Sequence, residues 1–227
     1  MFLCDFEPSW YFRLIYSIIL FLILTMQICH HRKIEKQKCK MGLKKNIFII
    51  IGSASKNSAN EKLIANFISL TKDFFETTVF TGLKSLPHFD PELSTNRPPP
   101  SIVDFRRNIE QADGIVICTP EYIFSIPAGL KNALEWCVAT TLFSEKPLAI
   151  ITASADGRKA HEELQLIMKT LMAKFTEVTA FLIQGVRGQV NEKGEIINKK
   201  IESDFVRFIQ AFMELTGVSE NKLNVPA

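Results

Sequence analysis

The feature that constrains the fold most is a repeated alternation between short apolar runs and helix-like segments. It begins at residue 46 with NIFIII, a run of apolar and β-branched residues that is typical of a buried strand. Four more runs with apolar or β-branched character follow, so that strands are predicted at 46–51, 76–81, 114–118, 147–152 and 178–183. Amphipathic or helix-forming segments predict helices at 58–71, 101–112, 127–140, 158–173 and 198–215. We expect the proline-rich stretch 82–100 to be a loop.

This alternation indicates an α/β fold. Successive strand–helix–strand units make the strands parallel and place helices on both faces of the sheet. Ligands of such sheets bind in the crevice beyond the carboxyl ends of the strands. The residues that directly follow each strand are therefore the first candidates for a functional site.

Residues 1–40 do not follow the alternation. The chain carries no charge from residue 14 to residue 29, and with residues 10–13 this stretch approaches the ~20 residues that cross a bilayer. Two interpretations remain open: residues 10–29 are a membrane anchor, or translation starts at Met41 and residues 1–40 are a mis-assigned start. In both cases we expect the folded domain to be 41–227. The basic run that follows would keep it in the cytoplasm, anchored to the inner face of a membrane only if the anchor is real.

The composition argues against several other classes of protein. The net charge of +3 is concentrated in the basic segment 32–45, so the main body is close to neutral and offers no nucleic-acid surface. Five cysteines without a CxxC pair argue against a disulfide framework or a zinc site. The chain has no Ser-His-Asp or Cys-His arrangement, and we expect His88 and His161 to be solvated or packed. We therefore expect no metal and no catalytic side chain.

The loop after the first strand has the chemistry of an anion site. It reads GSASKNSAN over residues 52–60 and leads into a helix, whose free amides and dipole favour a phosphate. The side chains that can donate hydrogen bonds or charge to it are Ser53, Ser55, Lys56, Ser58 and Asn60. Gly52 permits the turn and the close approach of a ligand. An alternative needs no ligand, because Ser58 and Glu61 have the spacing of a capping box.

Two more loops lie at the same predicted edge of the sheet. Residues 119–122 (TPEY) follow the third strand, where backbone groups and Tyr122 can hold a planar heterocycle, although an ordinary turn would have the same sequence. Residues 152–158 follow the fourth strand and are mostly small, which permits a ligand to approach the backbone closely.

Three segments resemble the NADPH-dependent FMN reductase family. The loop GSASKNSAN is similar to its phosphate loop GSxRxxSxN, and LPHFDPEL (86–93) is similar to its LPxxDxDL loop. The most specific match is TPEYIFSIPAGLKNALEW (119–136), which resembles TPEYNxSxPGxLKNAxDW. The resemblance covers about residues 46–182 and implies a flavodoxin-like doubly wound sheet of five parallel strands in the order 2-1-3-4-5. It also implies FMN at the carboxyl edge, with NADPH or NADH as hydride donor.

The resemblance implies roles for individual residues. Ser53, Ser58 and Asn60 would hold the FMN phosphate; Pro120, Glu121 and Tyr122 would border the isoalloxazine ring; Ser154 and Gly157 would lie near its other side. Leu130, Lys131, Asn132 and Trp136 match a helix that packs at a dimer interface in the family, so we expect a homodimer or homotetramer.

The chain departs from the family pattern at two positions of this site. Ser55 stands where the pattern has arginine, and Ile123 stands where it has asparagine. We keep both among the cofactor-binding residues, and we expect Lys56 to replace part of the missing charge as a point charge.

The predicted function is therefore that of an oxidoreductase. Hydride would pass from the nicotinamide through bound FMN to a flavin, a quinone or a similar small acceptor by a ping-pong mechanism, with the cofactor carrying the chemistry. Two alternatives lack turnover: a degenerate flavin-binding sensor and a flavodoxin-like electron carrier.

Overall fold

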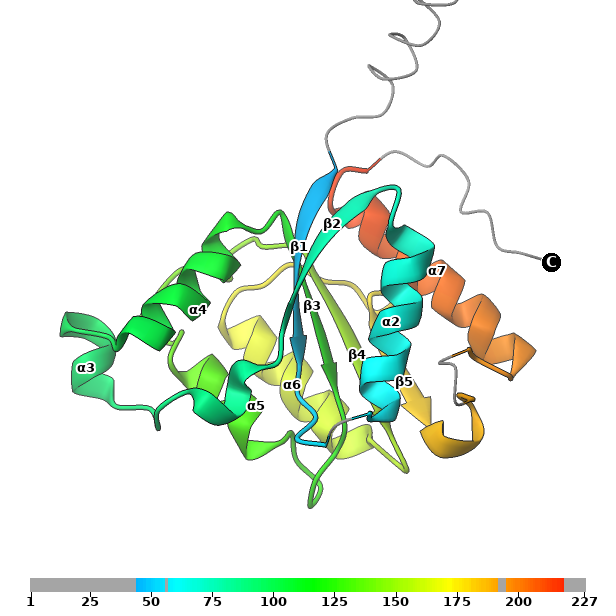
Figure 1. Cartoon of the computed structure of the whole chain (residues 1–227), viewed down its shortest axis with the longest axis horizontal. Helices are drawn as coiled ribbons and strands as arrows, with labels where there is room; N and C mark the ends of the chain where they lie inside the picture. The colour runs from blue at the N-terminus through cyan, green and yellow to red at the C-terminus, as the bar shows by residue number, and fades with distance from the viewer. Residues whose placement is uncertain (1–43, 56, 192–194, 219–227) are drawn as a thin grey trace, which may run out of the picture. The chain divides into compact units, whose positions relative to one another are not determined.

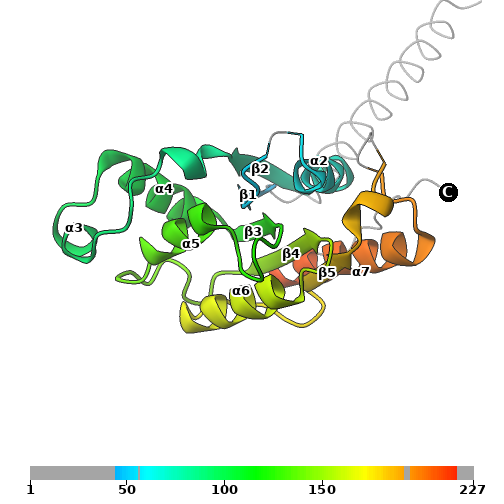
Figure 2. The same cartoon turned by 90° about the horizontal axis from the view of Figure 1, so that it is seen from below.

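The computed structural model of the chain describes residues 44–55, 57–191 and 195–218. They form a sheet of five parallel strands in the order β2-β1-β3-β4-β5 (Figure 1), which confirms the predicted order. The strands are β1 (Lys45–Ile51), β2 (Phe75–Phe80), β3 (Gly114–Thr119), β4 (Leu148–Ser154) and β5 (Ala180–Gln184). Every neighbouring pair is parallel, so all carboxyl ends lie at one edge, the edge that faces the viewer in Figure 2.

Both faces of the sheet are covered by helices, as predicted. Ile47, Ile49 and Ile51 of β1 pack in a core with α2 (Ala59–Thr71) and α7 (Lys199–Leu215). The alternate residues Phe48 and Ile50 pack on the other face with helices α4, α5 and α6. These three are α4 (Pro100–Gln111), α5 (Ala128–Glu135) and α6 (Arg158–Thr170). Burial of both faces explains why β1 and β3 are continuous apolar runs.

The prediction of a loop over residues 82–100 is wrong. The stretch contains a 3₁₀ turn, η1 (Gly82–Ser85), and a short helix, α3 (Pro91–Asn96). Asp90 caps α3, because its side chain accepts hydrogen bonds from the amides of Glu92 and Leu93 at 2.9 and 3.0 Å. Pro91 fits the first helical position, so the prolines here begin helices rather than exclude them.

Helix α5 is shorter than predicted, since it ends at Glu135 and not at residue 140. The Arg106 side chain donates to the carbonyl of Trp136 from its Nε at 3.0 Å. This carbonyl would otherwise accept from the amide of Thr140, which instead bonds to Cys137 at 3.0 Å. A side chain from α4 therefore helps to end the helix.

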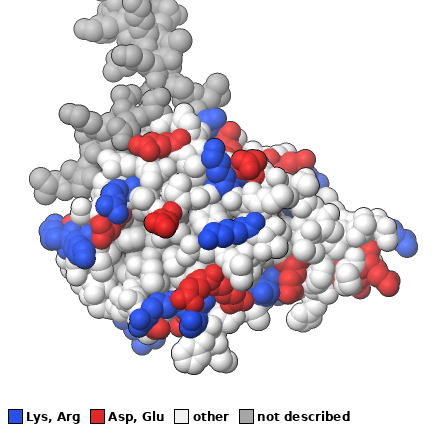
Figure 3. Space-filling view, turned by 180° about the vertical axis from the view of Figure 1, so that it is seen from behind, with Lys and Arg blue, Asp and Glu red and all other residues white. Residues whose placement is uncertain are grey.

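Charges of both signs interleave on the surface. On the face shown in Figure 3, Lys and Arg side chains alternate with Asp and Glu and form no continuous basic patch. Among the described residues, no helix is long and apolar enough to cross a membrane. The predicted anchor at 10–29 and the alternative start at Met41 lie outside the residues that the structure describes.

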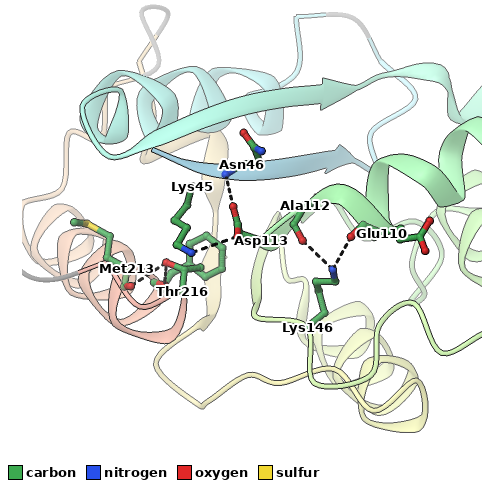
Figure 4. A network of polar contacts seen from close by, with 9 residues as sticks. Lys45, Asn46, Glu110, Ala112, Asp113, Lys146, Met213 and Thr216 are labelled. Atoms are coloured by element: carbon green, nitrogen blue, oxygen red, sulfur yellow. Dashed lines mark hydrogen bonds and ion pairs between the residues drawn. The ribbon is translucent and has the colours of Figure 1, made fainter. Parts of the chain in front are cut away.

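Polar contacts fix the amino end of the sheet, opposite the edge where ligands are expected (Figure 4). Asp113, in the turn before β3, accepts from the amide of Asn46 at 2.8 Å and from Lys45 Nζ at 3.3 Å. Lys146 Nζ donates to the carbonyls of Glu110 and Ala112 at 3.1 and 2.8 Å. Partial burial lowers the pKa of Lys146, although Asp113 and Glu110 oppose this shift. The Asp113 bonds tie β1 to the turn that introduces β3, and the Lys146 bonds tie the segment before β4 to the end of α4 and to the same turn.

Candidate functional site

A cleft of about 870 Å³ opens at the carboxyl edge of the sheet. The loops after β1, β3, β4 and β5 all contribute to its wall, and its volume lies within the range of ~300–1,000 Å³ typical of small-molecule sites. Most of the predicted site residues line it, namely Ser53, Ser55, Ser58, Asn60, Pro120, Glu121, Tyr122 and Ser154. The structure therefore brings three loops that are far apart in the sequence into one site. Lys56 lies outside the described residues.

Gly52 begins the first loop for a reason that the sequence did not indicate. A Cβ atom there would lie 2.5 Å from Thr119 Oγ1 and 2.9 Å from Thr119 Cβ. Its amide donates to the carbonyl of Cys118 at 2.8 Å, and its φ is not positive. Gly52 thus allows the ends of β1 and β3 to approach each other; it does not line the cleft, although it lines a neighbouring pocket.

Ser58 begins helix α2. Its hydroxyl accepts from the amide of Glu61 at 3.2 Å, which is the N-cap contact that the capping alternative predicted. The amides of Ala59 and Asn60 have no acceptor among the described residues. Because the cleft wall includes both residues, the cap and an anion site are compatible.

The Asn60 side chain holds this loop in place. It is buried, and its Nδ2 donates to the carbonyl of Ala153 at 3.3 Å. Its Oδ1 lies 3.3 Å from the thiol of Cys118, which donates to it. Burial raises the pKa of that thiol far above its ordinary value, so the cysteine stays protonated and inert. The carboxamide that was predicted to hold phosphate therefore also joins α2 to the ends of β3 and β4.

Two carboxylates join the loop after β3 to helix α6. Glu121 accepts from the amides of Gly157 and Ala160 at 3.3 and 2.9 Å, which satisfies the amino end of α6. Gly157 takes a positive φ of 83° as the N-cap of α6 and does not line the cleft, so its contribution is to the position of Glu121.

Glu163 of α6 holds the other end of the loop. Its Oε2 accepts from Ser125 Oγ at 2.6 Å and from the amide of Ile126 at 3.0 Å, and its Oε1 pairs with Lys131 at 3.3 Å. Partial burial alone would raise the pKa of Glu163, but these donors together hold it below its ordinary value. No sequence pattern pointed to Glu163, because it lies within helix α6 and not in a loop after a strand.

The turn from Tyr122 to Ser125 has an unusual backbone. The two residues exchange backbone hydrogen bonds of 2.9 and 3.1 Å, and Ile123 and Phe124 between them have φ of 50° and 58°. Positive φ at both central positions favours asparagine or glycine and is rare for a β-branched residue. Ile123 is 95% exposed and does not line the cleft, so the geometry does not support its predicted contact with the cofactor.

The Tyr122 ring closes one side of the cleft. Partial burial raises the pKa of the Tyr122 phenol, but the neighbouring polar groups of Ser53, Ser55 and Ala54 outweigh it and lower the pKa overall. Tyr122, Ser53 and Ser55 also line a second pocket of about 510 Å³, so Tyr122 and the first loop form the wall between the two cavities.

Several residues of the cleft were not predicted. Asn57 has a φ of 55°, a conformation that asparagine tolerates well, and Lys62 follows on α2. The turn after β5, η2 (Val186–Gly188), contributes Arg187. The rule that ligands bind at the carboxyl ends of parallel strands applies to this loop as well, and would have found it. His161 does not line the cleft: its Nδ1 bonds to Thr152 Oγ1 at 2.8 Å, and burial lowers its pKa.

Comparisons with known proteins identify the class to which this fold and site belong. The sequence model of the NADPH-dependent FMN reductase family matches residues 45–186, and the chain belongs to this family. It is thus an NAD(P)H-dependent oxidoreductase that uses FMN, as predicted.

Among its relatives is the quinone reductase of Escherichia coli strain K12, which is 27% identical over 181 residues, covering 77% of this chain and 96% of that protein. The NADPH azoreductase of Bacillus sp. strain OY1-2 is 24% identical over 180 residues, covering 78% of this chain and 98% of that protein. Among solved structures, the flavoenzyme NAD(P)H:(acceptor) oxidoreductase FerB of Paracoccus denitrificans superposes with a TM-score of 0.66 at 24% identity. This match covers 76% of this chain and 97% of FerB and supports the fold.

The cleft fits FMN. It offers a dianion the unpaired amides at the start of α2 and the serine hydroxyls around them, and it is large enough for a flavin. The loop after β3 lines the same cleft, so its backbone can border the planar ring of a flavin whose phosphate lies at the start of α2.

Proposed function

We propose that this protein passes hydride from NADPH or NADH to a quinone or a similar small acceptor, at the cleft beyond β1, β3, β4 and β5. One observation supports this best: the amino end of α2, whose first amides suit an anion, and the loop after β3, which Glu121 joins to α6, line the same cleft. The acceptor class is proposed from the names of the relatives, which include quinone reductases and an azoreductase. Bound FMN supplies the acceptance of hydride and the donation of electrons.

The chain's own residues bind and orient the cofactor. The hydroxyls of Ser53, Ser55 and Ser58, with the amides of Ala59 and Asn60, hold the phosphate, and Lys56 stays a predicted point charge. Pro120, Glu121 and Tyr122 border the ring, and Ser154 approaches it from the loop after β4. Glu121 acts through the position of its backbone, since its carboxylate is bonded to α6.

We propose a ping-pong order, in which the nicotinamide leaves before the acceptor binds. One open cleft is then sufficient for both molecules, and no separate acceptor site is needed. No described side chain in the cleft has the arrangement of a nucleophile and its base, so proton transfer is left to water or to the acceptor.

A homodimer or homotetramer also stays a proposal. Leu130 and Trp136, which were matched to a dimer interface, are fully buried within one chain. Asn132 likewise bonds within the chain, to Phe89 and Pro87. Any interface would therefore use other residues of this region, and light scattering of the purified protein would measure its mass.

The test uses the full chain, purified and saturated with FMN. We expect NADPH or NADH to be oxidised beyond the one equivalent that reduces bound FMN only when an acceptor such as a quinone is present, with parallel lines in double-reciprocal plots as a ping-pong order requires. Ser58→Ala should weaken FMN binding about tenfold, because it removes a hydroxyl from the phosphate and the cap of α2. The matched control is Ser69→Ala, an exposed serine of the same helix that does not line the cleft.

The proposal predicts turnover as well as the binding of FMN. A chain that binds no FMN, or that binds it and oxidises no nicotinamide with any quinone, flavin or azo acceptor, would contradict it. Binding without turnover would instead favour the sensor or the electron carrier.

A further inference from the structure

The proposed ligand of the cleft carries a strongly charged phosphate, but few cations line the cleft. A phosphate monoester carries about −1.5 to −2 charges at neutral pH. Ser55 occupies the position at which the family pattern has arginine, and the described residues of the first loop, 52–55 and 57–60, contain no cation. Hydroxyls and amides satisfy the oxygens of the phosphate but leave its charge uncompensated.

Lys62 lies one helical turn beyond the N-cap of α2. Its amide donates to the carbonyl of Ser58 at 3.1 Å, so the two residues lie one above the other on the same side of the helix. Side chains in a helix lean toward its amino end, which directs Lys62 toward the loop and not away from it. Lys62 accordingly lines the cleft together with Ser53, Ser55 and Ser58.

The ammonium group of Lys62 is available for a ligand. Its side chain is half-buried, and within the described part of the chain it forms neither a hydrogen bond nor an ion pair. A lysine of intermediate exposure packs its stem against the protein and keeps its ammonium group accessible, so this group can pair with an anion in the cleft.

Arg187 is the other described cation in the wall of the cleft, but it lies at a different part of it. Its turn follows β5, and the amide of Gly185 donates to the carbonyl of Ala155 at 3.0 Å. This bond ties the turn to the loop after β4, whereas Lys62 stands on the helix that begins at Ser58. The phosphate end of the cleft is thus the Lys62 end.

We propose that Lys62 binds the phosphate of FMN and supplies the positive charge that Ser55 does not. This assignment rests on the proposed function, since it takes FMN to be the ligand of the cleft. It adds a binding residue that lies outside the loop motif. It also explains how the loop tolerates a serine: the charge comes from the next turn of the same helix.

The test compares two flavins that differ only in the phosphate. The full chain is freed of flavin, and the dissociation constants of FMN and riboflavin are measured by quenching of flavin fluorescence. Lys62→Gln should raise the dissociation constant of FMN about tenfold, the effect of losing one charge-assisted bond, and leave that of riboflavin within twofold. Lys62→Arg should restore FMN binding. Lys56→Gln, measured in parallel, separates this effect from that of the neighbouring loop lysine.

The matched control is Lys72→Gln. Lys72 is an exposed lysine at the other end of the same helix, so its loss changes the net charge equally without reaching the cleft. Added salt should weaken FMN binding in the wild type more steeply than in Lys62→Gln, because exposed charge pairs are screened.

Two results would overturn the assignment of Lys62 and leave the proposed function intact. One is an equal FMN-to-riboflavin ratio in Lys62→Gln and wild type, and the other is loss of phosphate discrimination in Arg187→Gln but not in Lys62→Gln. A wild-type chain that binds neither flavin would overturn the proposed function, and the assignment of Lys62 with it. The wild-type titration therefore distinguishes the two failures.

Discussion

Among single residues, Gly52 is explained by the close approach of the Thr119 side chain, which leaves no room for a Cβ atom. We predict that Gly52→Ala lowers the free energy of unfolding by about 1–3 kcal/mol, the usual cost of overpacking, since the new methyl group meets Thr119 at 2.5 Å. Urea unfolding would measure the change. The control is Gly188→Ala, where an added Cβ has no neighbour within 4 Å and should alter stability by less than about 0.5 kcal/mol. Equal effects of the two substitutions would contradict the contact argument.

Ile123 shows what sequence comparison misses at this scale. The substitution of an asparagine predicts the loss of one polar contact near the ring, but the residue points away from the cleft at a φ of 50°. What changes is the backbone energy of the turn, because asparagine adopts this conformation more easily than isoleucine. The types of the site residues could be predicted from the motif, whereas the direction of each side chain depends on φ and on contacts with distant elements.

At the scale of the element, two motifs that appeared separate in the sequence form one unit. Pro87, in the segment LPHFDPEL, accepts from Asn132 Nδ2 and Trp136 Nε1, both at 2.9 Å, and Phe89 donates to Asn132 Oδ1 at 2.8 Å. The motif around α5 thus serves to hold the segment before α3. Periodicity predicted the strands and most helices, but not α3, because a helix of six residues is too short to show a period.

The attachment of the loop after β3 to α6 predicts a dependence of stability on pH. The folded-state pKa of Glu163 lies below its ordinary value of 4.5, so its contribution is complete above that value and is lost as pH falls through the folded-state pKa. The stability difference between wild type and Glu163→Gln should therefore be constant from pH 7 to about pH 5 and shrink below it, in urea unfolding at each pH. Glu162→Gln, which removes an exposed carboxylate whose ion pair within the described residues is with Lys159, should show little difference throughout. A difference that grows on acidification would contradict the role of Glu163.

At the scale of the whole molecule, the alternation of apolar runs determines the α/β class, and the strand order follows from the family resemblance. The position of the loop after β5 beside the site follows from the strand-end rule, but which of its side chains line the cleft could not be predicted. Val186 and Val190 are buried in the core beneath the cleft, so the packing of β5 and η2 brings Arg187 to its rim. Such a placement depends on tertiary contacts of β5 and η2, and the family motifs, which lie in the segments before β5, do not report on them.

Mutations at the amino end of the sheet should change the stability of the fold without changing the affinity for FMN. Asp113 anchors β1 at its amino end through the amide of Asn46 at 2.8 Å (Figure 4), whereas the cleft lies beyond the carboxyl ends of the strands. We predict that Asp113→Ala lowers the free energy of unfolding by about 1–2 kcal/mol through loss of this charge-assisted bond. The dissociation constant of FMN should remain within twofold of wild type, because mutations at distant, independent sites act additively.

The control for this substitution is Asp104→Ala, which removes an exposed carboxylate that pairs with Arg107 on the surface of α4. Such a pair contributes little, so the expected loss of stability is less than about 0.5 kcal/mol. Ser58→Ala should differ from Asp113→Ala in its effect on FMN affinity, which should fall about tenfold, whereas loss of its cap should lower stability by a similar amount, about 1 kcal/mol. If Asp113→Ala weakened FMN binding tenfold at temperatures where the protein is fully folded, the two ends of the sheet would be energetically coupled. The site would then depend on the register of β1 along its whole length.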